Sequence, residues 1–75
     1  MITIDLQGPE GNVFSLIGLA SVLLKNKGHS QVFIDEVIDD MKSKDYNHAL
    51  TVFESNLGDV VQFLNDPRQI NQVNS

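Results

Sequence analysis

The sequence predicts a small α+β domain in which three helices pack on a two-stranded sheet, in the order β-α-α-α-β. Apolar and polar residues alternate over residues 2–6, apolar residues recur at helical spacing in three later stretches, and a second β-rich run covers residues 60–64. A chain of 75 residues has room for one domain. We expect residues 1–66 to form it, and the polar residues 67–75 to be a disordered tail.

The opening strand is followed by the sequence GPEGN, residues 8–12. Pro9 cannot continue a hydrogen-bonded ladder, and the flanking glycines permit a sharp reversal of the chain. Asn12 is a favourable N-cap for the helix that begins at Val13. That helix ends at the C-cap glycine Gly28. It is apolar nearly all round, so we expect it to be covered on several sides and to be the hub on which the other helices pack.

Two further helices are predicted after this one, with Ser30 and Asp45 as their N-caps. Each carries an apolar stripe at helical spacing. The stripe of the second helix consists of Ile34, Val37, Ile38 and Met41, and that of the third consists of Tyr46, Ala49, Leu50, Phe53 and Leu57. Gly58 ends the third helix.

Residues 60–64 form the second predicted strand, with a continuation of the third helix as the competing interpretation. A lone strand has unpaired backbone groups, so the strand at residues 2–6 needs this partner. The sequence leaves their relative direction open. A two-stranded sheet has open edges, and a small domain without cysteine lacks disulfide staples. We therefore expect a homodimer or a higher homo-oligomer, with pairing of strand edges as one route to it.

Ten acidic and five basic residues give a net charge of −5, and no basic cluster is present. Direct binding of nucleic acid is therefore disfavoured, because neutralising phosphates requires clustered Lys and Arg. The most acidic patch lies on the second predicted helix and is the candidate for contacting a partner protein with a basic surface. It consists of Asp35, Glu36, Asp39 and Asp40. Its simplest interpretation is a solvated helix face.

Gly8, Gly11 and Asn12 are a second candidate site, for an anion or a nucleotide. A glycine loop between a strand and a helix N-terminus can present backbone amides to a phosphate. The loop lacks the Lys and the Ser/Thr of a P-loop, and Glu10 adds a negative charge where a phosphate would bind. The simpler interpretation is a structural turn.

No catalytic constellation, metal site or cofactor site is recognised in the sequence, so we expect a protein that is not an enzyme. His29 and His48 lack the spacing of a metal-binding pair, and neighbouring carboxylates such as Asp39 and Asp40 diverge on a helix. No signal peptide is recognised, and the apolar stretch at residues 13–24 is too short for a bilayer span of about 20 residues. These features predict a cytoplasmic protein.

The stretches ITIDLQGPEGN and VFSLIGLA resemble the start of a group of short, largely uncharacterised bacteriophage-encoded proteins, and the later stretches DEVIDDM and VFESNLGDVV fit the same outline. The resemblance covers most of residues 2–64. It implies a phage accessory protein that acts in the host cytoplasm by binding a host protein and modulating or inhibiting it, in counter-defence or host takeover. The alternative is a protein that sequesters a nucleotide or another anion at the Gly8–Asn12 loop. A third hypothesis is an assembly role through strand edges.

Overall fold

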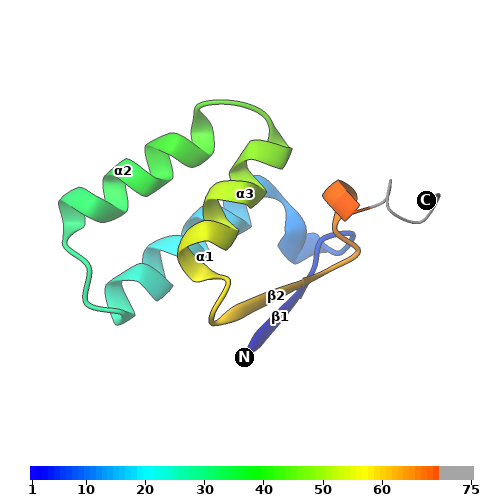
Figure 1. Cartoon of the computed structure of the whole chain (residues 1–75), viewed down its shortest axis with the longest axis horizontal. Helices are drawn as coiled ribbons and strands as arrows, with labels where there is room; N and C mark the ends of the chain where they lie inside the picture. Colours follow the sequence, from blue (N-terminus) through cyan, green and yellow to red (C-terminus); the bar gives the residue numbers. More distant parts are fainter. Residues whose placement is uncertain (70–75) are drawn as a thin grey trace.

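The computed structural model describes residues 1–69. Figure 1 shows a strand, three helices and a second strand, which confirms the predicted α+β class and element order. Residues 70–75 of the predicted tail lie outside the described residues. The elements are β1 (Ile2–Asp5), the short 3-10 turn η1 (Pro9–Gly11), α1 (Val13–Asn26), α2 (Gln31–Lys42), α3 (Tyr46–Leu57) and β2 (Val61–Leu64).

The two strands run parallel, with Ile2 beside Val61 and Asp5 beside Leu64. The sequence left this direction open. Parallel strands need a long crossover connection, and here the three helices supply it. The interpretation of residues 60–64 as a continuing helix is wrong, since β2 begins at Val61 directly after a turn. The buried face of the sheet packs against α3, where the rings of Phe53 and Phe63 lie 5.3 Å apart.

All three predicted N-caps are confirmed by side-chain hydrogen bonds. The backbone N–H of Ser15 donates to Asn12 Oδ1 at 2.8 Å, that of Phe33 donates to Ser30 Oγ at 3.2 Å, and that of His48 donates to Asp45 Oδ1 at 2.9 Å. Each bond satisfies a backbone donor that the first turn of a helix leaves without a partner. At the other end of α1, Gly28 has a φ of 92°, the left-handed conformation expected of a C-cap glycine.

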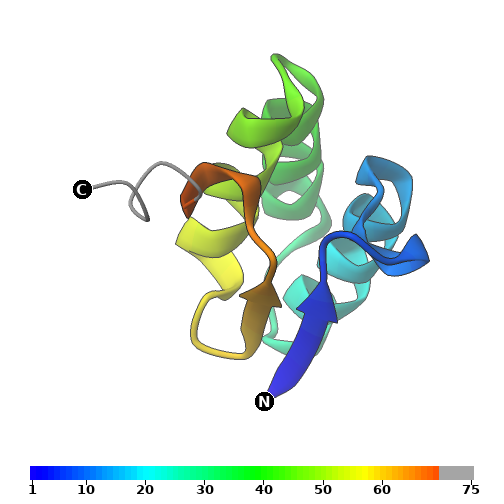
Figure 2. The same cartoon turned by 90° about the vertical axis from the view of Figure 1, so that its right-hand side faces the viewer.

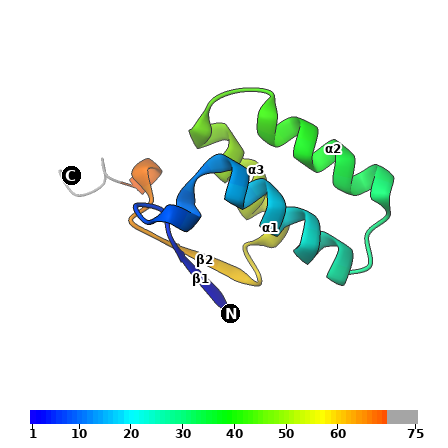
Figure 3. The ribbon, with the colours of Figure 1, turned by 180° about the vertical axis from the view of Figure 1, so that it is seen from behind.

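The sequence predicted α1 as the hub of the helices, but the helix with the most buried side chains is α3. Its buried residues are Ala49, Leu50, Val52, Phe53 and Leu57, whereas α1 buries Leu16, Ala20 and Leu24. The prediction that α1 is covered on several sides is also wrong, because Phe14 is 81% exposed and Val22 is 56% exposed. Seen from behind in Figure 3, α1 lies in front of α3, and no other described element covers its outer side.

The loop between β1 and α1 folds back tightly on the end of the strand. A Cβ atom at Gly11 would lie 2.4 Å from the carbonyl oxygen of Leu6, so only glycine fits at this position. The Tyr46 hydroxyl, at the start of α3, donates a hydrogen bond to the Gly11 carbonyl. The loop is thereby fixed between β1 and α3, and it holds the first turn of α1 beside the junction of α2 and α3.

Residues 67–69 form a helical turn after β2. Figure 2 shows this turn, in orange-red, lying against α3. No helix in the described part of the chain is long and apolar enough to cross a bilayer.

Candidate functional site

The four acidic residues that the sequence singled out are all exposed on α2. The opposite side of this helix is buried through Ile34, Val37 and Met41, as its amphipathic pattern predicts. The Asp35 carboxylate accepts a hydrogen bond from Gln31 Nε2 at 2.9 Å, a contact within the same helix. Glu36 and Asp39 make no side-chain hydrogen bond or ion pair among the described residues.

Asp40 differs from the other three because it faces α3. Its Oδ1 lies 2.8 Å from His48 Nε2, and it also accepts a hydrogen bond from the Ser43 hydroxyl at 3.3 Å. The hydrogen bond with His48 is the main reason that the pKa of Asp40 is lowered from its ordinary value. Asp40 therefore joins α2 to α3, and the carboxylates available to a partner are Asp35, Glu36 and Asp39.

Large apolar side chains accompany these carboxylates on the outer sides of α1 and α2. Val32, one helical turn before Asp35 and Glu36, is 69% exposed. On α1, Phe14 and Val22 are exposed, and no residue between positions 13 and 24 carries a charge. We call this set of residues the α1–α2 surface: Phe14, Val22, Val32, Asp35, Glu36 and Asp39. The sequence predicted the acidic residues of this surface from their charge. It could not predict that its apolar residues are exposed, because their exposure depends on the fold.

A groove of ≈ 490 Å³ lies at one end of this surface, between the start of α1 and the junction of α2 and α3. Its apolar lining comes from Val13, Phe14, Ile17, Met41 and Tyr46, and its polar lining comes from Asn12, Lys42, Lys44 and Asp45. The polar atoms of Asn12 and Asp45 serve as helix caps. The ion pairs of the described residues involve Lys27, His48 and Arg68, so both lysines of the groove are left available to a ligand or partner.

Sequence reasoning missed this groove because it joins residues about thirty positions apart. The only local signal was the pair Lys42 and Lys44, two basic residues directly after an acidic helix. They are flanked in the sequence by Asp40 and Asp45. The lining of the groove therefore combines apolar side chains with two lysines and one carboxylate, that of Asp45.

The geometry argues against the predicted anion cradle at Gly8, Gly11 and Asn12. The N–H of Gly8 donates to the Asp5 carbonyl at 3.0 Å, and that of Gly11 donates to the Gly8 carbonyl at 3.1 Å. The Asn12 amide group donates to the Pro9 carbonyl and to the Ser15 hydroxyl. These donors are already paired within the loop, so the loop acts as a structural turn.

A shallow hollow beside the loop also has the wrong charge for an anion. It measures ≈ 290 Å³ and is lined by Asp5 and Glu10 together with Thr3, Gly8 and Pro9. Two carboxylates and no cation repel phosphate. The hydrogen bond from the Asn65 amide is the main reason that the pKa of Asp5 is lowered, and it favours the ionised form of this carboxylate.

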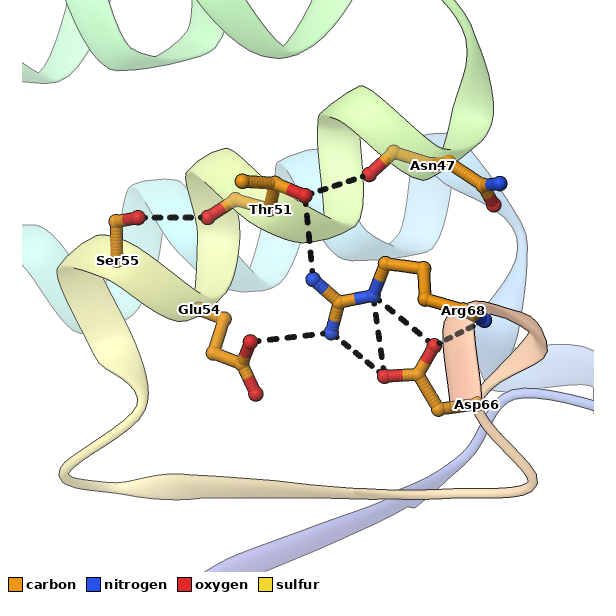
Figure 4. A network of polar contacts seen from close by, with 6 residues as sticks. All are labelled: Asn47, Thr51, Glu54, Ser55, Asp66 and Arg68. Carbon is orange, nitrogen blue, oxygen red and sulfur yellow. Dashed lines mark hydrogen bonds and ion pairs between the residues drawn. The ribbon is translucent and has the colours of Figure 1, made fainter. Parts of the chain in front are cut away.

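A buried ion pair that the sequence did not indicate fixes the C-terminal turn to α3 (Figure 4). Asp66 is the buried charged residue of the described chain, at 6% exposure. The Arg68 guanidinium donates to it through Nε at 3.0 Å and through Nη2 at 2.6 Å. Arg68 also reaches the Glu54 carboxylate at 3.2 Å and the Thr51 hydroxyl at 3.2 Å, both on α3.

This network has a structural role. The hydrogen bonds from Arg68 hold the pKa of Asp66 below its ordinary value, and those from Asp66 raise the pKa of Arg68. The guanidinium also lies 5.9 Å from the centre of the Phe63 ring. All donors and acceptors of the cluster come from α3 and from residues 63–68, so the network closes the side of α3 that faces the C-terminal turn. The sequence suggested a tail beginning at residue 67, and at Arg68 the chain is still held by α3.

No group of three or more His, Cys, Asp and Glu residues in the described chain is arranged to hold a metal ion. The two histidines have other contacts. The ring of His29 stacks on Phe33 at 4.4 Å between centroids, and His48 pairs with Asp40. Of the two neighbours in the sequence, Asp40 contacts His48, whereas Asp39 makes no side-chain hydrogen bond or ion pair among the described residues.

Comparison of the chain with protein-family models, with curated proteins and with solved structures gives no match.

Proposed function

We propose that this protein is a small binding module that attaches to a partner protein through the α1–α2 surface and inhibits or modulates it. The observation that supports this most is the exposure of Phe14 on α1, at 81%, and of Val32 on α2, at 69%. Helix α2 also carries the acidic residues. Large apolar side chains surrounded by polar ones are typical of protein interaction sites. The partner would present apolar side chains beside basic ones.

The two kinds of side chain would contribute differently to the complex. Full burial of Phe14 or Val32 against a partner would stabilise it by about 1.5–3 kcal/mol each. Exposed aromatic residues of this kind frequently carry a large share of binding energy. Asp35, Glu36 and Asp39 would mainly accelerate association and fix orientation, because the charges at the rim of an interface affect the on-rate more than the affinity.

The resemblance to phage-encoded proteins supplies the identity of the partner class in this proposal. Under it, the partner is a host protein with a basic surface, encountered in the host cytoplasm, and binding serves counter-defence or host takeover. Action by binding, without catalysis, fits the engagement of the described histidines and of Asp40, Asp45 and Asp66 in structural contacts.

Affinity capture from host lysate, followed by a direct binding measurement with the captured protein, tests the proposal. The substitutions Phe14→Ser and Val32→Ser should each weaken binding about tenfold or more, since tenfold corresponds to about 1.4 kcal/mol. Leu64→Ser is the matched control, because Leu64 is also an exposed apolar residue, at 45%, but lies on β2.

A second arm separates the contribution of charge. The triple variant Asp35→Asn, Glu36→Gln, Asp39→Asn should slow association and reduce its salt dependence. Glu10→Gln removes one exposed carboxylate from the loop and serves as the control, compared with Glu36→Gln alone. Unchanged binding in both the apolar and the acidic variants would remove the α1–α2 surface as the contact site.

A further inference from the structure

One side of helix α2 carries a negative charge toward the start of the helix and a positive charge at its end. Asp35 and Lys42 are seven positions apart, two turns of helix, and so lie on the same side of α2. Both are exposed. Ile38, half-buried, lies between them one turn from each. A stripe that is acidic at one end and basic at the other is complementary to itself when two copies run in opposite directions.

From this charge arrangement we propose that the protein forms a two-fold symmetric homodimer in which the α2 helices run antiparallel and Asp35 of each copy faces Lys42 of the other. With the axis crossing α2 between Ile38 and Asp39, both residues lie about 5 Å from the axis along the helix, at a rise of 1.5 Å per residue. Each contact then occurs twice by symmetry. The inference does not rest on the proposed function. It uses Phe14 and Asp35, which the proposed function assigns to contact with the partner protein, so a second copy and the partner would compete for this part of the molecule.

The groove lies at the edge of the same interface. Lys42 lines it together with Phe14 and Ile17 of α1, so pairing at Lys42 brings this part of α1 toward the second copy. Helix α1 contributes an outer side without charge at residues 13–24, and apart from the backbone of the helix itself no atom lies within 4 Å of the position of a Cβ at Gly18. This uncharged side, with the exposed Phe14 ring, offers apolar area for contact with the second copy. Burial of this ring would supply affinity, and the two ion pairs would set orientation.

A second copy supplies the same two charges in the reverse order, which the stripe on α2 requires of the chain that it contacts. The net charge of −5 disfavours association of copies in general, so a dimer needs a local arrangement that sets unlike charges opposite each other. The antiparallel α2 pair supplies this arrangement. The competing route, pairing between the open edges of β1 and β2, leaves Lys42 and the groove unused.

Sedimentation equilibrium of the full chain over a concentration series, with charge-reversed variants, tests the dimer. The wild-type protein should dimerise, and Asp35→Lys and Lys42→Glu should each raise the dimer dissociation constant about tenfold or more. An equimolar mixture of the two variants should restore association, because each reversed charge then meets an unlike one. Glu36→Lys should dimerise as the wild type does, because position 36 lies about 100° around the helix from position 35.

Circular dichroism and thermal unfolding confirm that each variant is folded, and the restored association of the mixture excludes damage to either chain. The proposal is overturned by a wild-type chain that stays monomeric at every concentration, by unchanged dimerisation of Asp35→Lys, or by a mixture that remains monomeric. It is also overturned if Leu64→Asp abolishes the dimer while the charge reversals leave it intact, since the strand edges would then form it. A monomer that still captures a partner removes the dimer and leaves the proposed function standing. A dimer that captures no partner removes the proposed function and leaves the dimer standing.

Discussion

Helices α1 and α3 are similar in length, 14 and 12 residues, yet the structure treats their apolar side chains differently. In α3 the apolar side chains are buried or half-buried, between the sheet, the other two helices and the C-terminal turn. In α1, the more apolar sequence, Phe14 and Val22 remain exposed. Helix α1 therefore carries more apolar side chains than the core buries, and the exposed ones lie on its outer side.

The difference shows that position in the fold, and not apolarity alone, decides which helix is central. Helix α3 is followed directly by β2 and by the turn at 67–69, and both pack back on it. Helix α1 contacts α2 and α3 on one side only (Figure 3). We interpret the uncovered side of α1 as a contact surface, because exposed apolar residues that stabilise no core are a solubility cost in a free monomer.

The largest expected effect separates the two helices directly. Phe53 of α3 is 1% exposed, so Phe53→Ala should lower the free energy of unfolding by about 3–5 kcal/mol. Phe14→Ala removes the same ring from α1 and, at a concentration at which the protein is monomeric, should change it by no more than about 0.5 kcal/mol. Urea unfolding of both variants gives the comparison. Similar losses at the two positions would mean that α1 is packed in solution as α3 is.

The next largest effect is expected at the C-terminal turn, which packs on α3. Asp66→Asn removes a buried carboxylate and leaves Arg68 without its main partner, so we expect a loss of about 1–3 kcal/mol in unfolding free energy. Because the pKa of Asp66 is lowered in the folded state, this contribution is present above the unfolded pKa of about 3.9 and is lost as the pH falls through the folded pKa.

Urea unfolding at pH 7 and at several values from pH 4 downward measures this dependence. The difference in stability between wild type and Asp66→Asn should shrink as the pH falls. Other carboxylates with lowered pKa, such as Asp59 paired with Lys27, remain in both proteins and cancel in the comparison. A difference that stays constant down to the acid transition would contradict the role given to the Asp66–Arg68 pair.

Two glycine substitutions sharpen the contrast between a packed and an open position. Gly11→Ala places a Cβ against the Leu6 backbone and should destabilise the protein by about 1–3 kcal/mol. Gly18→Ala meets no atom on the exposed side of α1 and should stabilise it by up to about 1 kcal/mol, because alanine is the better helix former. Thermal unfolding gives both signs. A destabilising Gly18→Ala in the monomer would show that something already covers this side of α1.

The smallest effect is expected at the link between α2 and α3. Asp40→Asn removes a charge that pairs with His48 at the surface, and such exposed pairs contribute little to stability. We therefore expect only a slight fall in Tm. Differential scanning calorimetry measures it, with Asp39→Asn as the control that has no partner on α3.

The sequence predicted the class, the element order and the caps because each depends on short-range chemistry. Asn12, Ser30 and Asp45 cap helices through bonds three residues away, and this spacing is visible in the sequence. The parallel direction of the strands and the central place of α3 depend on how distant elements pack, and periodicity carries no information on either. The same limit applies to the groove and to the Asp66–Arg68 pair, whose contacts with α1 or α3 join distant residues.

Of the two predicted sites, the acidic one is where the structure adds most. All four acidic residues are exposed as expected, but Asp40 pairs with His48 of α3. Val32, one helical turn before Asp35 and Glu36, adds an exposed apolar side chain. At the loop, the sequence showed glycines able to bind an anion, and the fold uses their N–H groups internally. Composition can identify donors, whereas their availability is decided by tertiary structure.

Amide hydrogen exchange tests whether the α1–α2 surface contacts the partner. It is measured on the free protein, at a concentration at which it is monomeric, and on its complex with the captured partner. We predict that binding slows exchange within residues 13–22 of α1 and 31–42 of α2, with little change in β1, β2 and the loop at residues 8–12. Protection confined to the strands or to that loop, with α1 and α2 unchanged, would contradict it.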